Sequence, residues 1–123
     1  MANEKILVVD DDKNICELLR LYLVKEGYNV TMVHDGGAAL AEFDKLHPDL
    51  VLLDVMMPVM DGYAAARAIR AGGQPRAGTV PIIAMSANAY AEDVKKCLDS
   101  GMNAHISKPL FKDVMLRTIA RFV

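Results

Sequence analysis

The chain has 123 residues, of which 53% are hydrophobic and 24% are charged, and this composition excludes a disordered chain or a polar linker. Its net charge of −2 gives no basic excess for binding nucleic acid or an anionic membrane surface. The apolar stretches are too short to span a membrane, and the two cysteines, Cys16 and Cys97, form neither a CxxC pair nor a disulfide framework. We therefore expect one domain over residues 1–123, with reduced thiols, in the cytoplasm.

Short continuous apolar runs alternate along the chain with stripes of helical period. The runs predict five strands, at residues 6–9, 28–33, 50–53, 81–85 and 104–106. The stripes predict five helices, which begin near residues 13, 38, 62, 91 and 111. Five strands that each precede a helix predict a parallel sheet with helices on both faces, an α/β fold.

Several residues mark the expected boundaries of these elements. Asp12 is a natural N-cap for the first helix, and Gly27 is a natural stop for it. Gly36 and Gly37 are expected to turn the chain before the second helix, and residues 72–78 are expected to form an exposed loop. The apolar stripes are expected to face the core: Ile15, Leu18, Leu19, Tyr22 and Leu23 in the first helix, and Val114, Met115, Ile119 and Phe122 in the last.

Polar residues follow the predicted strands where each one ends. These residues are Asp10, Asp11 and Asp12 after the first strand, Asp54 after the third, Ser86 after the fourth and Lys108 after the fifth. Because ligands gather at the carboxyl ends of parallel strands, we expect these side chains to share one edge of the sheet. Carboxylates held close together repel, and a hard divalent cation such as Mg²⁺ relieves that repulsion. We expect Asp11 and Asp54 to bind the metal and Asp12 to serve as a helix cap.

A carboxylate can also act as a nucleophile toward a phosphoryl group. Asp54 is the best placed of the acids, since it stands alone at the end of the central strand. Lys108 would then neutralise the phosphoryl group and the Ser86 hydroxyl would donate to one of its oxygens, although a surface charge and a turn residue are equally good interpretations of the two. A cis peptide bond before Pro109 is one way to aim the lysine inward, and the sequence leaves this open.

Four segments together resemble the receiver domain of two-component response regulators, over residues 5–121. They are ILVVDDD (6–12), LVLLDVMMPVMDG (50–62), PIIAMSA (81–87) and SKPL (107–110). Each segment is weak alone, but the four in this order and at these spacings are highly specific. The resemblance implies a doubly wound, flavodoxin-like fold with five helices and a five-stranded parallel sheet of order 2-1-3-4-5.

The resemblance also implies a role for each matching residue. Asp54 resembles the phosphoacceptor, which takes a phosphoryl group from a phosphohistidine and later loses it by hydrolysis. Asp11 resembles the direct Mg²⁺ ligand, Asp10 the acid that binds the ion through water, and the backbone carbonyl of Met56 the third protein ligand; Mn²⁺ is an alternative ion. Ser86 matches the switch hydroxyl, Lys108 the phosphate-binding lysine, and the peptide before Pro109 one that is usually cis.

One position departs from the family pattern. His105 stands where the switch aromatic is usually Tyr or Phe, which puts the usual coupling between aromatic and hydroxyl in doubt. The histidine at this position, together with the sequences of segments 85–102 and 101–110, makes the chain most similar to receivers of hybrid sensor histidine kinases. We therefore expect a histidine kinase or a histidine phosphotransfer domain as partner, with no direct contact to nucleic acid or membrane, and a monomer or weak homodimer. We also expect a piece cut from a longer chain, the cytoplasmic end of a membrane-bound kinase, over a stand-alone receiver.

Three other functions compete with this one. An aspartate-nucleophile phosphohydrolase needs a general acid two residues after the nucleophile, and Met56 cannot move a proton. A flavodoxin-like cofactor binder needs a phosphate-cradling loop after the first strand, where three aspartates would repel the phosphate. The runner-up is a receiver-like interaction module that is never phosphorylated. The interpretation as a receiver domain implies chemistry that the protein performs on itself, with no external metabolite as substrate.

Overall fold

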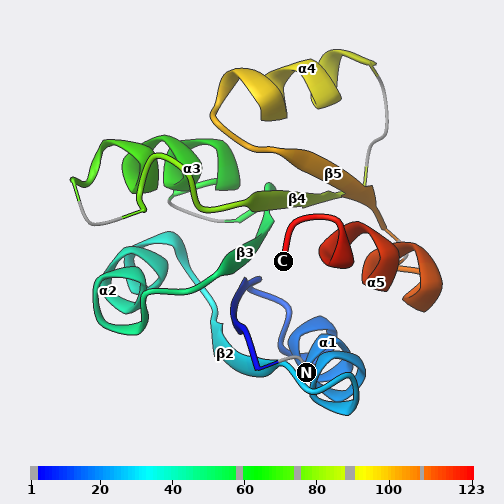
Figure 1. Ribbon diagram of the computed structural model, residues 1–123. Coiled ribbons are helices and arrows are strands. Elements are labelled where there is room, and N and C mark those ends of the chain that lie inside the picture. Colours follow the sequence, from blue (N-terminus) through cyan, green and yellow to red (C-terminus); the bar gives the residue numbers. More distant parts are fainter. Residues whose placement is uncertain (1–2, 58–59, 74–75, 88–90, 109) are drawn as a thin grey trace.

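The computed structural model describes residues 3–57, 60–73, 76–87, 91–108 and 110–123. Strands and helices alternate from the first element to the last (Figure 1). The strands are β1 (Lys5–Val9), β2 (Asn29–Val33), β3 (Leu50–Asp54), β4 (Ile82–Ser86) and β5 (Ala104–Ser107). The helices are α1 (Lys13–Lys25), α2 (Gly36–Leu46), α3 (Gly62–Ala71), α4 (Ala91–Asp99) and α5 (Lys112–Ala120).

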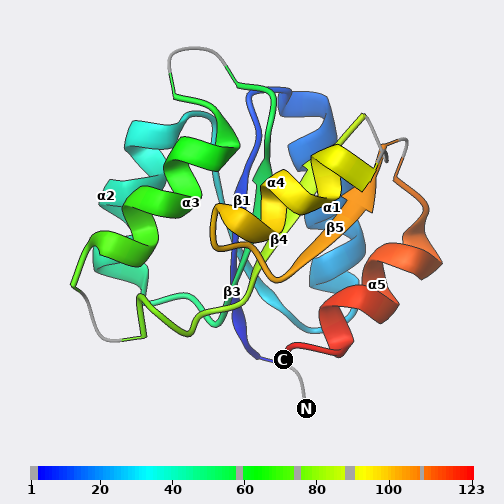
Figure 2. The same cartoon turned by 90° about the horizontal axis from the view of Figure 1, so that it is seen from above.

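The five strands form one parallel sheet in the order β2-β1-β3-β4-β5. Helices α1 and α5 cover one face, and α2, α3 and α4 cover the other (Figures 1 and 2). The predicted doubly wound α/β fold and its strand order are therefore confirmed. Within the described residues, no helix combines the length and apolar character needed to cross a membrane.

Two apolar cores lie on opposite faces of the central strands. Every residue of β3 and β4 is buried, as expected for strands of a parallel sheet that is covered on both sides. Successive side chains of a strand point to opposite faces, so Leu52 packs toward α1 and α5 while Leu53 packs toward α2 and α3. The two cores hold the carboxyl ends of β1 and β3 at fixed positions in the middle of the sheet.

The start of α2 differs from the expectation. Gly36 and Gly37 do not turn the chain; they are the first two residues of the helix, and Asp35 is its N-cap, accepting from the amide of Ala38 at 2.7 Å. The glycine at 36 has a packing role, because a Cβ built there would lie 2.9 Å from the Cβ of Met60. The prediction of a turn was wrong because a helix cap followed by two glycines has the same sequence pattern as a turn.

Two predicted core residues face solvent. Leu18 in α1 and Val114 in α5 are 39% and 44% exposed, whereas Leu19 and Met115 beside them are buried. Each helix buries a narrower stripe than the apolar pattern suggested, because only one side of it meets the sheet. In the loop after α3, exposed Arg76 and Gly78 agree with the prediction, but Ala77 between them is buried.

Candidate functional site

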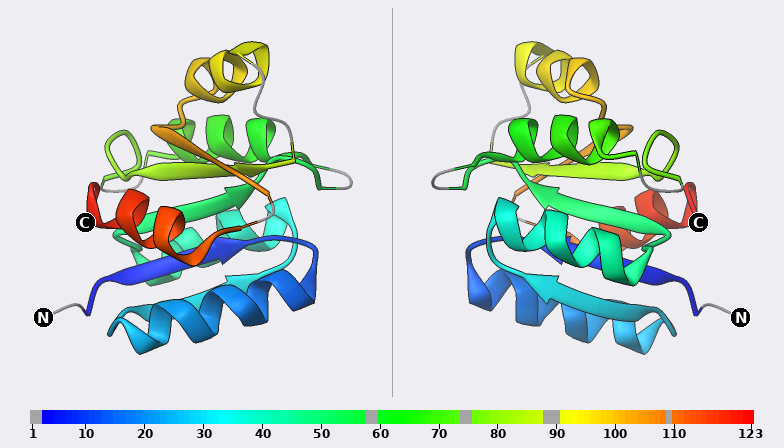
Figure 3. Two further views of the ribbon diagram at one scale, coloured as in Figure 1. Left: turned by 90° about the vertical axis from the view of Figure 1, so that its right-hand side faces the viewer. Right: turned by 90° about the vertical axis from the view of Figure 1, so that its left-hand side faces the viewer.

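Three carboxylates meet at the carboxyl edge of the sheet. Val9 pairs with Leu53 across β1 and β3, so Asp10 and Asp54, the next residues along these two strands, lie side by side. Each of Asp10, Asp11 and Asp54 offers an oxygen atom within 4.8 Å of those of the other two. Asp10 and Asp54 are buried, and Asp11 is exposed. The structure therefore brings together three of the four acids that the sequence predicted to share this edge. The sheet and its edges are seen in side view in Figure 3.

Asp54 is held in an environment that disfavours its charged form. Burial raises the pKa of its carboxyl group, and the nearby Asp10 carboxylate raises it further. The amide of Met56 donates to Oδ1 of Asp54 at 3.1 Å, and this bond and the Lys108 ammonium lower the pKa. The net result is a pKa of about 6, so the carboxylate is the ionised form at neutral pH but an unusually basic one.

Lys108 reaches the carboxylates from the end of β5. Its Nζ lies 3.1 Å from Oδ2 of Asp10 and 3.4 Å from Oδ1 of Asp54. Burial alone would lower the pKa of this ammonium, but the two carboxylates outweigh burial and raise it. The amide of Lys108 donates to the carbonyl of Ser86 at 2.7 Å. This hydrogen bond holds the backbone of Lys108 against the end of β4.

Asp12 has the capping role that the sequence predicted. Its side chain accepts from the amides of Asn14 and Ile15 at 2.9 and 3.3 Å. Its own amide donates to Oδ1 of Asp10 at 2.9 Å. Asp12 thus stabilises the first turn of α1 and orients Asp10, and it is not one of the three clustered acids.

Two residues that the sequence did not connect with this site hold the backbone carbonyl of Asp10. Nδ1 of His34 lies 3.0 Å from that oxygen, and Sγ of Cys16 lies 3.3 Å from it. The two side chains are 3.7 Å apart. They come from α1 and from the residue after β2, and no sequence spacing joins them. The strand order, which places β2 beside β1, brings His34 to Asp10, and the packing of α1 on the sheet brings Cys16 there.

Gly62 is a further residue whose importance the sequence did not reveal. A Cβ at this position would collide with the backbone carbonyl oxygen of Asp54 and would lie 2.6 Å from Cα of Val55. The amide of Gly62 donates to the carbonyl of Val55 at 3.2 Å. The start of α3 therefore packs directly on the backbone of Asp54, which only glycine permits. The Asp61–Gly62 pair before an alanine-rich helix was the available signal, but it indicates a cap as readily as a close contact.

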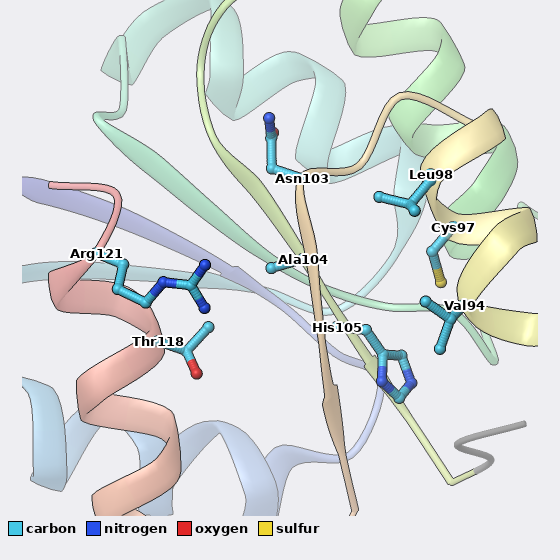
Figure 4. Close-up of a pocket in the computed structure, with 8 residues that line it drawn as sticks. All are labelled: Val94, Cys97, Leu98, Asn103, Ala104, His105, Thr118 and Arg121. Carbon is cyan, nitrogen blue, oxygen red and sulfur yellow. The ribbon is translucent and has the colours of Figure 1, made fainter. Parts of the chain in front are cut away.

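Ser86 and His105, the two residues predicted to form a switch, occupy neighbouring strands. Ser86 is the buried last residue of β4. His105 pairs with Ala84 in the register of β4 and β5 and lines a pocket of about 380 Å³ between α4, β5 and α5 (Figure 4). Within the described part of the chain, Nε2 of His105 is buried without a hydrogen-bond partner. The pocket is lined by Val94, Cys97, Leu98, Asn103, Ala104, His105, Thr118 and Arg121.

The remaining predicted site residues lie in the loops that border the carboxylates. The Met56 side chain is 71% exposed beside Asp54, and its amide is the group that contacts the Asp54 carboxylate. The use of its carbonyl as a metal ligand stays a prediction. Pro109 lies outside the described residues, and so does the predicted cis peptide bond before it.

The three clustered acids fit a divalent metal ion. When all three are ionised they carry three negative charges, and Lys108 supplies one positive charge within 4 Å of two of them. Two negative charges therefore remain without a partner in the cluster, which is the charge that one Mg²⁺ ion balances. The donors are carboxylate oxygens, the ligands that Mg²⁺ prefers.

Comparison with known proteins agrees with this geometry. Residues 6–120 match the family model of the response regulator receiver domain. The chain is 43% identical over 117 residues to the sensor histidine kinase RcsC of Escherichia coli K12. This alignment covers 95% of this chain and 12% of that relative. It is 40% identical over 119 residues to the DNA-binding response regulator MtrA of Mycobacterium tuberculosis H37Rv, covering 96% of this chain and 50% of that relative. The chain thus spans at most half of these relatives.

Solved structures show the same fold. The chemotaxis protein CheY4 of Vibrio cholerae superposes with a TM-score of 0.93 at 29% identity, over 98% of this chain and 99% of that one. The receiver domain of the sensor histidine kinase PA1611 from Pseudomonas aeruginosa superposes with a TM-score of 0.88 at 38% identity, over 98% and 97% of the two chains. The latter structure holds a magnesium ion coordinated in its active-site cleft. The chain belongs to the response regulator receiver domain family, the phosphoacceptor modules of two-component signalling.

Proposed function

We propose that Asp54 is the residue that accepts the phosphoryl group, in a Mg²⁺-dependent transfer from a phosphohistidine donor. The observation that carries this assignment is the position of its carboxylate. Asp54 ends the central strand, its Oδ1 lies 3.4 Å from the Lys108 ammonium, and it offers an oxygen within 4.8 Å of those of Asp10 and Asp11. Asp10 is also buried and also contacts Lys108, but Asp54 stands at the end of the central strand β3, with β1 on one side and β4 on the other.

The transfer is a substitution at phosphorus. A carboxylate oxygen of Asp54 attacks, the new P–O bond forms, and the P–N bond to the donor imidazole breaks. The electron pair of that bond leaves with the imidazole nitrogen, which takes up a proton from solvent. Hydrolysis later reverses the state of Asp54: a water oxygen attacks the phosphorus, and the carboxylate and inorganic phosphate are released. No external metabolite is consumed.

The neighbouring residues supply charge and hydrogen bonds. Lys108 neutralises negative charge on the transferred group, since its ammonium already lies within 4 Å of Asp54. The Ser86 hydroxyl, at the buried end of β4, donates to one phosphoryl oxygen. Asp11 directly, Asp10 through water and the carbonyl of Met56 would hold Mg²⁺ or Mn²⁺. When bound, this ion offsets the negative charge that the carboxylates and the phosphoryl oxygens bring together.

The proposal includes a conformational switch that uses Ser86, Lys108 and His105. Phosphorylation changes the charge that faces Lys108, and the lysine backbone is bonded to Ser86 at the ends of β4 and β5. His105 lies two residues before the end of β5 and lines the surface between α4 and α5. A shift at the end of β5 beside Lys108 therefore has a short path to that surface, with an imidazole where the family usually has the ring of Tyr or Phe.

We also propose that the chain is a receiver of a hybrid sensor kinase that exchanges its phosphoryl group with a histidine kinase or a histidine phosphotransfer domain. The similarity to RcsC and to the PA1611 receiver supports this, although MtrA relatives are DNA-binding regulators at comparable identity. We propose no direct nucleic-acid or membrane contact for this domain, a monomer or weak homodimer, and a cytoplasmic location where ATP-dependent kinases act.

The test is the intact mass of the protein after incubation with acetyl phosphate, with Mg²⁺ and with a chelator. We expect one added phosphoryl group in Mg²⁺ and none in chelator. The Asp54→Asn variant should gain no mass under either condition, because an amide is close in shape to the carboxylate but is a poor nucleophile.

Asp12→Asn is the matched control, since Asn also caps a helix and the change removes a carboxylate at the same edge without touching the cluster. This variant should be labelled like the wild type. Labelling of Asp54→Asn at another residue would refute the assignment of Asp54. Equal labelling in chelator would refute the metal requirement. A wild type that gains no mass from acetyl phosphate or from a phosphorylated histidine phosphotransfer domain would favour an interaction module that is never phosphorylated.

A further inference from the structure

Asp11, the proposed direct metal ligand, depends on the backbone for its orientation. Its side chain is exposed, and among the described residues none of the hydrogen bonds or ion pairs involves its carboxylate. Within the described ranges, no side-chain contact therefore aims it toward Asp54. What remains is the direction of the Asp10–Asp11 peptide group, which fixes where the Asp11 side chain leaves the main chain.

The carbonyl of that peptide group is held by two side chains. Nδ1 of His34 lies 3.0 Å from the Asp10 carbonyl oxygen, and Sγ of Cys16 lies 3.3 Å from it. Because a carbonyl oxygen only accepts, the imidazole must carry its proton on Nδ1 and the thiol must donate its own. The two donors come from separate elements, one from α1 and one from the chain that leaves β2.

The side chain of His34 replaces a backbone hydrogen bond that would otherwise continue the pairing of β1 and β2. The amide of Asp10 donates to the carbonyl of Val33 at 3.2 Å, so in a parallel ladder the next donor to the Asp10 carbonyl would be the amide of Asp35. That bond is not among those of the described residues, since Asp35 has turned away to cap α2. The imidazole of His34 fills the vacant position.

We propose that His34, supported by Cys16, is a positioning residue that fixes the Asp10–Asp11 peptide and thereby aims the Asp11 carboxylate at the metal position beside Asp54. The proposal rests on the metal-binding role given above to Asp11. It adds a residue that touches neither the metal nor the phosphoryl group. Without the imidazole donor, the peptide is free to rotate toward another donor, and Asp11 moves with it.

The experiment compares two variants at His34 by the dissociation constant of Mg²⁺ alone. His34→Leu removes the donor, whereas His34→Asn keeps an N–H group at nearly the position of Nδ1. The dissociation constant is measured at one fixed pH from the NMR shifts of backbone amides near Asp54. We expect it to rise about tenfold in His34→Leu and to stay within about twofold of the wild type in His34→Asn, as is typical when a residue that orients a ligand is lost.

Two further variants keep the test decisive. Cys16→Ala removes the weaker donor and should raise the dissociation constant less than His34→Leu does, which serves as the measurement if His34→Leu fails to fold. His47→Asn removes an exposed imidazole at the far end of α2 and should leave Mg²⁺ binding unchanged. The free energy of unfolding in chelator, measured alongside, separates a general loss of stability from a specific loss of metal affinity.

The outcomes distinguish this inference from the proposed function. A wild type whose amides do not shift with Mg²⁺ would contradict the metal site itself. A wild type that binds Mg²⁺, with unchanged affinity in both His34→Leu and Cys16→Ala, would overturn the positioning role alone. Equal weakening in His34→Leu and His34→Asn would also overturn it, because the retained donor would then make no difference.

Discussion

The ammonium of Lys108 lies 3.1 Å from Oδ2 of Asp10, although the two residues are 98 positions apart in the chain. Asp10 is fully buried, and the lysine side chain is 21% exposed. The pair joins the end of β1 to the end of β5 across the carboxyl edge of the sheet. Asp54, the proposed phosphoacceptor, ends β3 between these two strands and shares the same ammonium, so the pKa values of Asp54 and Lys108 depend on each other and on the Asp10 carboxylate.

We expect the Asp54→Asn variant to be more stable than the wild type at pH 7 in chelator. The pKa of Asp54 is raised from 3.8 to about 6, so the folded state binds the proton more tightly than the unfolded state does. The contribution of this carboxyl group to stability is therefore highest below pH 4 and falls as the pH rises through the window from 3.8 to 6. Each tenfold change in proton affinity is worth ~1.4 kcal/mol, which gives ~3 kcal/mol at pH 7 as the most that removing the charge can recover.

Urea unfolding in chelator at pH 7 and at pH 4.5 measures this effect. We expect a gain of about 1–3 kcal/mol in the free energy of unfolding at pH 7, and a smaller gain at pH 4.5, where Asp54 is already protonated. Saturating Mg²⁺ should reduce the difference, because the ion binds the wild-type cluster and stabilises it. A variant that is less stable than the wild type at pH 7 would contradict this charge repulsion.

Replacement of Lys108 should have the opposite effect. Lys108→Met removes the ammonium that faces two buried carboxylates, and an uncompensated charge in a buried site is costly. We expect a loss of about 3 kcal/mol in the free energy of unfolding at pH 7 in chelator, and a smaller loss as the pH falls and Asp54, with its raised pKa, takes up a proton. In the Lys108→Met background, Asp54→Asn should raise the free energy of unfolding by more than it does in the wild type, because the carboxylate that it removes has lost its ammonium partner. If the two changes are additive, the proposed coupling is wrong.

The parallel sheet and the meeting of the three acids could be predicted from strong local patterns in the sequence, whereas the strand order was implied by the resemblance to receiver domains. Buried strands such as 50–53 are continuous apolar runs, and the site residues follow those runs directly. Once parallel strands are inferred, their carboxyl ends must share an edge. The positions of Asp10, Asp54 and Lys108 followed from these two steps alone.

The parts that could not be predicted depend on contacts between elements that are distant in sequence. The hydrogen bond from His34 to the Asp10 carbonyl requires the chain after β2 to turn toward α2 at one particular residue. The burial of Leu19 rather than Leu18 depends on the angle at which α1 meets the sheet. Apolar periodicity defines a helix, but it does not define that angle to within one residue.

Gly62→Ala should damage the site through packing alone. The added methyl group would meet the carbonyl oxygen of Asp54 and Cα of Val55, and backbone atoms cannot move aside as a flexible side chain can. We expect a loss of about 2–4 kcal/mol in the free energy of unfolding and a lower rate of phosphorylation in the fraction that folds. Gly37→Ala is the matched control, since Gly37 is also helical and its Cβ would meet only Oδ1 of Asp35, at 3.4 Å. A gain or no change is expected there.

Arg70 should prove essential for stability but not for phosphorylation. Its guanidinium donates to the carbonyls of Ala77, Val80 and Gly101 and to Oδ1 of Asn103 at distances of 2.6–3.2 Å. These groups lie before β4 and β5, at the end of the sheet opposite to Asp54.

Arg70→Met would leave several carbonyls of that cluster without their donor, and we expect a loss of about 2–4 kcal/mol in the free energy of unfolding. Arg67→Met removes a single 3.2 Å bond to Ser100 from an exposed side chain and should cost about 0.5–1 kcal/mol. Below its unfolding transition, Arg70→Met should still gain one phosphoryl group from acetyl phosphate at the wild-type rate. A slower rate in the folded variant would show that the two ends of the sheet are coupled, and the separation of stability from phosphorylation would then be wrong.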